Sequence, residues 1–149
     1  MKVGDVMTPG IETVSPDASI QEAATLMAEH DVGALPVMAE RLEGILTDRD
    51  IILRVVVDGR DPTQVRVRDI MSSRLFTCTA DDTIETALQT MREHQVRRLP
   101  VLDGDEHVIG IVALSDLARV ERSAAPEKIV EALRDVAEPH RQAASTAGR

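Results

Sequence analysis

The sequence contains an internal repeat. Residues 5–38 and 69–102 align without a gap at a spacing of 64, and 13 of the 34 paired positions are identical, whereas ordinary residue frequencies would give roughly two. Beyond a two-residue insertion in the second copy, residues 44–51 match residues 110–117. Two copies are too few for a solenoid. The repeat therefore predicts two similar units packed about a pseudo-two-fold axis.

Each copy has the same predicted order of elements: strand, helix, strand, strand, helix. Apolar residues spaced three and four apart predict the helices, and short apolar runs between polar turns predict the strands. In the first copy these are a strand at 11–14, a helix from Ser19, strands at 35–38 and 44–46, and a helix from Thr47 that ends before Gly59. Capping boxes are predicted for Ser19 with Glu22 and for Asp82 with Glu85. The pattern as a whole predicts an α/β fold.

The repeats and the change of pattern after Arg122 predict four segments. The first repeat spans residues 3–59 and the second spans residues 67–122. Pro126 is favoured in the first turn of a helix, so a C-terminal helix is predicted at 123–138. Residues 139–149 lack an apolar period and are predicted to form a flexible tail.

Composition limits the partners that this chain can bind. Phe76 is the only aromatic residue and the formal net charge is −9. Stacking platforms and a basic face are therefore missing, so we expect no nucleic-acid partner and no anionic membrane surface. Cys78 is the only cysteine, so no internal disulfide can form. Together with an N-terminus that lacks a signal-peptide pattern, this favours a cytoplasmic location.

No catalytic constellation is evident. The sequence lacks the Gly-x-Ser-x-Gly, phosphate-loop and zinc-protease patterns, so we expect no enzyme, no catalytic residue and no cofactor. His30 and His94 end the matched helices, where an imidazole stabilises the helix C-terminus. No metal site is expected, because no His or Cys lies near them at ligand spacing. Cys78 lies in an apolar strand and is expected in the core.

The Leu-Pro-Val segments at 35–37 and 99–101 and the Gly-Ile-Leu-Thr-x-x-Asp turn at 44–50 resemble the CBS (cystathionine-β-synthase) domain. The likeness covers about residues 3–122 and occurs twice, as in the tandem pairs called Bateman modules and in small stand-alone bacterial two-CBS stress proteins. It implies two β-α-β-β-α domains that sense a ligand such as AMP, ADP, ATP or S-adenosylmethionine. Because no enzyme or transporter is attached, it also implies an unidentified protein partner. The apolar helical faces of both copies favour a homodimer.

In this family a binding site combines the Thr-x-x-Asp turn of one copy with the strands of the other. Carried over to this chain, the resemblance implies a ligand site made of Thr47, Arg49, Asp50, Leu75, Phe76, Arg97 and Arg98. It implies a second, weaker site made of Ile11, Glu12, Gly33, Ala34, Ala113, Ser115 and Asp116. Guanidinium groups bind phosphate oxygens bidentately, so only the first site is equipped for a nucleotide.

These residues also have a structural interpretation. Thr47 and Asp50 are favoured at a helix start, as N-cap and first-turn acid, and Arg97 could be a solvated charge at a strand end. Ala113, which lacks the hydroxyl of Thr47, and the acidic Glu12 favour loss of binding. The alternative is therefore a structural or interaction protein with degenerate pockets that docks through its C-terminal helix.

Overall fold

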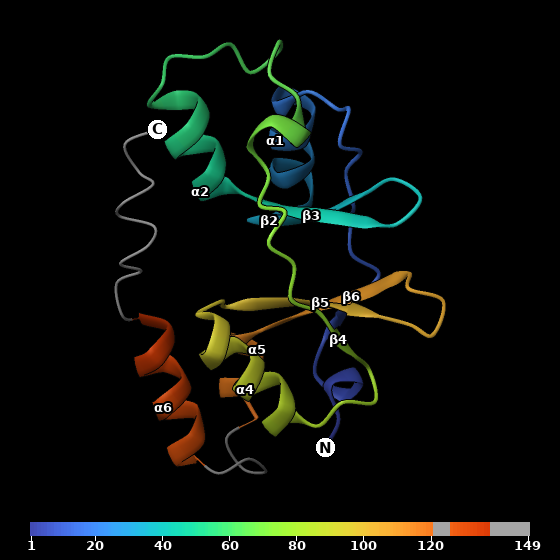
Figure 1. Cartoon of the computed structure of the whole chain (residues 1–149), viewed down its shortest axis with the longest axis vertical. Coiled ribbons are helices and arrows are strands. Elements are labelled where there is room, and N and C mark those ends of the chain that lie inside the picture. The colour runs from blue at the N-terminus through green and yellow to red at the C-terminus, as the bar shows by residue number, and fades with distance from the viewer. Residues whose placement is uncertain (121–125, 138–149) are drawn as a thin grey trace. The chain divides into compact units, whose positions relative to one another are not determined.

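The computed structural model describes residues 1–120 and 126–137. The chain divides into two units that follow the repeat (Figure 1). The first-repeat unit comprises residues 9–75 and 102–109, and the second-repeat unit comprises residues 1–8, 76–101 and the described residues from 110 onward. The N-terminal segment therefore joins the second copy of the repeat and not the first.

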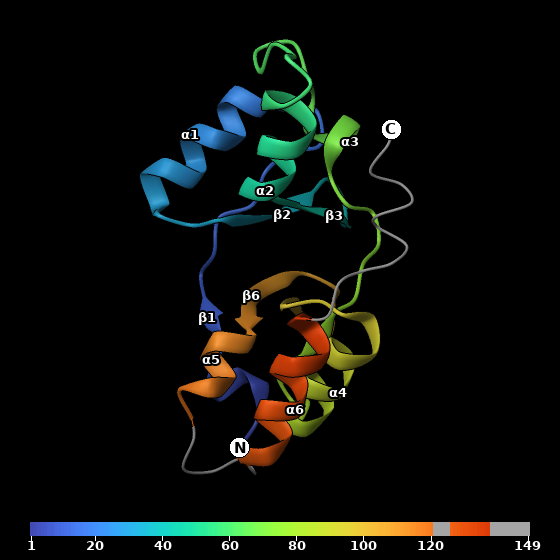
Figure 2. The same cartoon turned by 90° about the vertical axis from the view of Figure 1, so that its left-hand side faces the viewer.

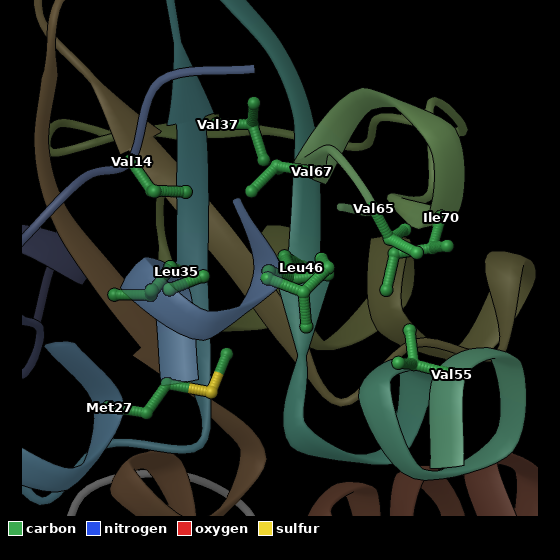
Figure 3. Close-up of a cluster of buried hydrophobic side chains, with 11 residues drawn as sticks. Val14, Met27, Leu35, Val37, Leu46, Val55, Val65, Val67 and Ile70 are labelled. Atoms are coloured by element: carbon green, nitrogen blue, oxygen red, sulfur yellow. The ribbon is translucent and has the colours of Figure 1, made fainter. Parts of the chain in front are cut away.

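The first-repeat unit is built on a two-stranded antiparallel ribbon. Its elements are α1 (Ile20–His30), β2 (Ala34–Met38), β3 (Leu42–Thr47), α2 (Asp48–Ile51), the π-helix η2 (Ile52–Val56) and α3 (Val67–Ile70). Helices α1, α2 and α3 lie on one face of the β2–β3 ribbon (Figure 2). Because strand side chains alternate between faces, Leu35, Val37 and Leu46 are buried beneath these helices. They join a cluster with Met27, Val55 and Ile70 (Figure 3).

The second-repeat unit contains a mixed set of short elements around a four-stranded sheet. They are η1 (Val3–Asp5), β1 (Thr8–Pro9), β4 (Cys78–Thr79), α4 (Ile84–His94), β5 (Arg98–Leu102), β6 (Val108–Ala113), α5 (Leu114–Ala118) and α6 (Pro126–Ala137). The strand order is β1-β6-β5-β4. Leu99, Val101 and Val112 repeat the buried positions of the first unit, so the two cores are built from matched residues.

Helix α6 packs on the helices of the second repeat. It packs on α4 and α5, and Ala132 and Val136 are buried there. Arg92 of α4 holds it through Asp135, with Nε 2.8 Å from Oδ2, and through Glu131, with 3.4 Å between the charged groups. The first repeat has Ala28 where the second has Arg92. The ionic anchor for α6 is therefore absent from the first copy.

The structure confirms most predicted elements and corrects two. The Ser19–Glu22 capping box forms with hydrogen bonds of 2.9 and 3.1 Å. The predicted strand at 11–14 is wrong, because only Val14 makes a ladder contact, a parallel bridge to Val37. The predicted Asp82–Glu85 box is also wrong: Thr83 caps α4, and the Asp82 carboxylate accepts the Thr79 N–H one turn earlier.

Three further expectations bear on the ends of the chain and on its core. Cys78 is buried, as expected, and α6 begins at Pro126, as its position predicts. The tail predicted at 139–149 lies outside the described residues. None of the helices in the described part of the chain combines the length and the apolar character needed to span a membrane.

Gly44 provides a test of the fold at a close backbone approach. A Cβ at this position would lie 2.6 Å from the Ser72 carbonyl oxygen and 2.8 Å from Met71 Sδ, closer than van der Waals contact allows. We expect Gly44→Ala to lower the free energy of unfolding by about 1–3 kcal/mol. Urea titration followed by circular dichroism measures this, since the chain lacks Trp and Tyr.

The matched control for Gly44 is Gly104→Ala, because a Cβ at Gly104 meets no heavy atom within 4 Å. The control should leave the urea midpoint within experimental error of the parent protein. Equal midpoints for both variants would contradict the close approach at Gly44.

Cys78 provides a test of core burial. Burial, with a contribution from Asp82, raises the pKa of the Cys78 thiol from 9.0 to about 12. A thiol whose pKa is higher in the folded state stabilises the fold while protonated, so this contribution is complete below pH 9.0 and is lost as the pH rises toward about 12. We expect iodoacetamide at pH 8.5 to alkylate Cys78 much more slowly in the native protein than in urea. Similar rates in both states would contradict a buried, neutral thiol.

Candidate functional site

The Thr47–Asp50 turn lies where β3 ends and α2 begins. Thr47 Oγ1 accepts the Asp50 N–H at 3.2 Å, and Asp50 Oδ2 accepts the Thr47 N–H at 2.9 Å. The structural interpretation of these residues is thus confirmed. The box uses Oδ2 of Asp50, and Oδ1 has no hydrogen-bond donor among the described residues. The cap therefore holds a carboxylate oxygen in a fixed place, available to a ligand hydroxyl.

The matched turn of the second repeat keeps only part of this arrangement. Asp116 Oδ2 accepts the Ala113 N–H at 2.8 Å, but Ala113 has no hydroxyl to return a bond to the Asp116 N–H. Asp116 Oδ1 lies 3.8 Å from Arg119, and the Asp116 side chain is only 14% exposed. Ser115 is exposed beside it. Unlike Asp50, this carboxylate has a second oxygen that faces an arginine of its own unit.

In both repeats the turn is tied to the residues that precede the Leu-Pro-Val strand. The Asp48 N–H donates to the Gly33 carbonyl at 2.9 Å, and the Leu114 N–H donates to the Arg97 carbonyl at the same distance. A Cβ at Gly33 would lie 2.9 Å from Asp48 Oδ2. A side chain at position 33 would therefore have to displace the Asp48 carboxylate, whereas the second repeat has Leu114 at the matched position beside Arg97.

Arg97 and Arg98 are exposed where β5 begins. Among the described residues, neither guanidinium forms an ion pair or a side-chain hydrogen bond, unlike Arg68 with Asp17 and Arg92 with Asp135. Ala34 stands at the position of Arg98 in the first repeat. The second-repeat unit therefore offers two adjacent positive charges that have no matched counterpart in the first.

The repeats also differ in the partner of their matched histidines. In the second repeat the rings of Phe76 and His94 stack with centroids 3.6 Å apart and planes 10° from parallel. In the first repeat Glu12 Oε1 lies 3.6 Å from His30 Nε2. Sequence analysis placed Phe76 and Glu12 in sites but missed both pairings. The equivalence of positions 12 with 76 and 30 with 94 was the signal that could have found them.

The predicted sites each draw residues from both units. The first-repeat unit holds Ile11, Glu12, Gly33, Ala34, Thr47, Arg49, Asp50 and Leu75, and the second-repeat unit holds Phe76, Arg97, Arg98, Ala113, Ser115 and Asp116. Within each unit the Asp-bearing turn and the residues before the strand are joined by the hydrogen bond described above. The assembly of each full site across both units stays a prediction.

One cluster of possible metal ligands was missed by sequence analysis. Ligand atoms of Asp103, Asp105 and His107, in the turn between β5 and β6, lie within 4.8 Å of one another. The Asp103 carboxylate already accepts the backbone N–H groups of Asp105 and His107. The His107 N–H is the largest cause that lowers the pKa of Asp103. These bonds explain the cluster as a structured turn.

Comparisons with known proteins agree on the family. The family model of the CBS domain matches residues 3–57 and 67–123. The CBS domain-containing protein YhcV of Bacillus subtilis is 50% identical over 117 residues, which cover 78% of this chain and 82% of YhcV. Hypoxic response protein 1 of Mycobacterium tuberculosis is 38% identical over 117 residues, covering 77% of this chain and 81% of that protein.

Solved structures give the same result. A crystal structure of Hypoxic Response Protein I with two coordinated zinc ions superimposes with a TM-score of 0.72 at 36% identity, covering 80% of this chain and 98% of that one. The CBS domain pair of MJ0100, in complex with 5-methylthioadenosine and S-adenosyl-L-methionine, has a TM-score of 0.72 at 26% identity, covering 80% and 94% of the two chains. With the repeat, the fold and the turns described above, these matches show that the chain belongs to the CBS domain family, as a tandem CBS pair.

Proposed function

We propose that this CBS pair is a regulatory module that binds an adenine nucleotide or a related adenosyl ligand. The observation that carries the proposal is the pair of exposed arginines, Arg97 and Arg98, which form no side-chain ion pair among the described residues. A phosphate that leaves water needs cationic partners. The adenosyl ligands of the MJ0100 pair support the same ligand class for this chain.

The residues of the proposed site have complementary tasks. Arg97 and Arg98 bind phosphate oxygens, since a guanidinium presents a planar fork of donors. Asp50 accepts hydrogen bonds from the ribose hydroxyls through Oδ1, because Oδ2 is held by the Thr47 N–H. Thr47, Arg49, Leu75 and Phe76 complete the site that we propose.

The matched second site is proposed to bind weakly or not at all. Gly33 and Ala34 supply no charge there, and Glu12 would repel a phosphate. On the other turn, the Asp116 carboxylate lies 3.8 Å from Arg119 and is largely buried. Ala113 lacks the hydroxyl of Thr47. None of these groups activates a water or a leaving group, so we propose binding without turnover.

The alternative function is an interaction protein with empty pockets. It is favoured by one observation: Thr47 and Asp50 bond to each other as a helix cap and Asp116 bonds to the Ala113 N–H. Capping alone can account for these residue types. Ligand binding measured on the whole chain decides between the two functions.

Titration calorimetry with AMP, ADP, ATP and S-adenosylmethionine tests the ligand site. Arg98→Ala removes a charge-assisted contact worth about 1.5–3 kcal/mol, so it should weaken AMP roughly ten- to a hundredfold while leaving adenosine nearly unaffected. Asp50→Asn keeps the cap acceptor but removes the ribose acceptor charge, so it should weaken both ligands. Asp116→Asn is the matched control and should change little.

Two results of this titration would contradict the proposal in different ways. Equal losses from Asp50→Asn and Asp116→Asn, or two equivalent sites per chain, would remove the asymmetry between the sites. No heat with any adenine ligand would favour the interaction protein.

We also propose that the chain is a homodimer that associates through the α2–η2 surface. This surface is the exposed aliphatic stripe of Ile52, Leu53, Val56 and Val57, whose exposures run from 46% to 68%. Four adjacent exposed aliphatic residues on one helix favour an interface. In the second repeat, the positions of Ile52 and Leu53 hold Ala118 and Arg119, so the stripe belongs to the first repeat alone.

The occupant that we propose for the α2–η2 surface is the same surface of a second copy. Helix α6 is a poor candidate, since its anchors Arg92 and Gln95 are replaced by Ala28 and Asp31 in the first repeat. An aliphatic stripe without an ionic anchor is best matched by another aliphatic stripe, and a two-fold contact supplies one.

The dimer proposal is tested by placing a charge in the stripe. The double variant Leu53→Asp with Val56→Asp should convert the dimer to a monomer in light scattering at micromolar concentration, because burying the charges opposite each other is costly. Val130→Asp, at an α6 residue that is 52% exposed, should leave the dimer intact. A monomeric parent protein, or a double variant that stays dimeric, would contradict the proposal.

A further inference from the structure

The matched histidines place different chemistry at the same position of the two repeats. His30 and His94 are the last residues of their helices. Their neighbours, Glu12 and Phe76, also occupy matched positions, each two residues before the residue that contacts the Leu-Pro-Val strand of its own repeat. In the first repeat the histidine faces a carboxylate, with 3.6 Å between Glu12 Oε1 and His30 Nε2. In the second it faces an aromatic ring. A single difference, glutamate against phenylalanine, therefore separates a carboxylate–imidazole contact from a ring stack.

The ring stack is unusually close. Its centroid separation of 3.6 Å is shorter than the roughly 4.5–7 Å common for aromatic pairs, so the imidazole covers much of one face of Phe76. Both rings are partly exposed. The stack therefore fixes the orientation of Phe76, a residue that is partly exposed.

The stack lies at the same edge of the unit as Arg97 and Arg98. Cys78 Sγ is 3.9 Å from the Pro100 carbonyl, where β4 lies beside β5. The matched contact in the first repeat, between Val14 and Val37, is parallel. Phe76 and Arg98 each precede the Cys78–Pro100 contact by two residues, so they start from the same end of neighbouring strands. An aromatic surface and two cations at one edge suit a ligand with an aromatic base and a phosphate.

We infer that His94 is a positioning residue that gives this site affinity for the base of its ligand, by holding the Phe76 ring on which the base stacks. In the first repeat, Glu12 is the neighbour of His30 and supplies no ring on which a base could stack. The inference rests on the proposed function and adds to it the residue that positions the ring for the base. It also explains why the repeats differ at position 12 and its match 76 while both keep the histidine.

The test compares AMP with ribose 5-phosphate, which has the same phosphate and ribose but no base, by titration calorimetry on the whole chain. Stacking of a base on an aromatic side chain contributes about 1–3 kcal/mol, or about fivefold to a hundredfold in affinity. His94→Ala should therefore weaken AMP at least about fivefold and leave ribose 5-phosphate unchanged. His94→Phe keeps a stacking ring and should restore AMP affinity. His30→Ala is the matched control in the first repeat and should leave AMP affinity unchanged.

A second measurement follows the ring itself. Phe76 is the only phenylalanine and the chain lacks Trp and Tyr, so its ring signals are identified by NMR without ambiguity. AMP should shift these signals in the parent protein and shift them much less in His94→Ala. Phe76→Leu, which keeps an apolar side chain but removes the ring, should weaken AMP about as much as His94→Ala and leave ribose 5-phosphate unaffected.

Each outcome decides a separate point. If His94→Ala weakens AMP and ribose 5-phosphate equally, or leaves AMP unchanged, the inference about His94 is overturned while the nucleotide site stands. An AMP loss in His30→Ala equal to that in His94→Ala overturns it as well. If the parent protein binds neither AMP nor ribose 5-phosphate, the proposed function fails and the inference fails with it.

Discussion

One backbone hydrogen bond organises both repeats. Its donor is the N–H of the first residue of the helix that follows the turn. Its acceptor is the carbonyl of the residue just before the Leu-Pro-Val strand. Its length is 2.9 Å in both copies, from Asp48 to Gly33 and from Leu114 to Arg97. Because the donor belongs to a helix start and the acceptor to a strand start, the bond fixes the turn against the strand whatever the side chains are. The side chains at these positions are therefore free to diverge while the fold is kept.

That divergence is coupled between neighbouring positions. Asp48 Oδ2 occupies the space that a Cβ at Gly33 would need, so an arginine at position 33 would displace this carboxylate. The second repeat differs at both positions, with Arg97 beside Leu114. The same logic applies to the histidines, where Glu12 faces His30 and Phe76 stacks on His94. Each repeat is thus internally consistent, and charge and aromatic surface have gathered on the second.

The sequence could predict the features that are local in the chain. The Ser19 and Thr47 capping boxes span three residues, and the repeat itself set the order of elements and the family. Two local predictions failed. The strand predicted at 11–14 did not form, because Val14 is its one residue that pairs with a strand. The capping box predicted for Asp82 did not form, because the Asp82 carboxylate accepts the Thr79 N–H instead. The Phe76–His94 stack joins residues 18 positions apart. No period or motif predicts such a pairing, and the equivalence of positions 12 with 76 and 30 with 94 was its only signal in the sequence.

The duplication gives one small chain two copies of a fold whose surfaces have diverged. In the second repeat, Arg92 and Gln95 hold α6 over α4, and Arg119 replaces the aliphatic Leu53 of the first repeat. That copy lacks the match of the aliphatic stripe and carries the arginine pair and the ring stack. The first repeat has the stripe of Ile52, Leu53, Val56 and Val57 and lacks the arginine pair. Apolar association and recognition of a charged ligand place opposite demands on a surface, so in the functions that we propose each demand falls on a different copy.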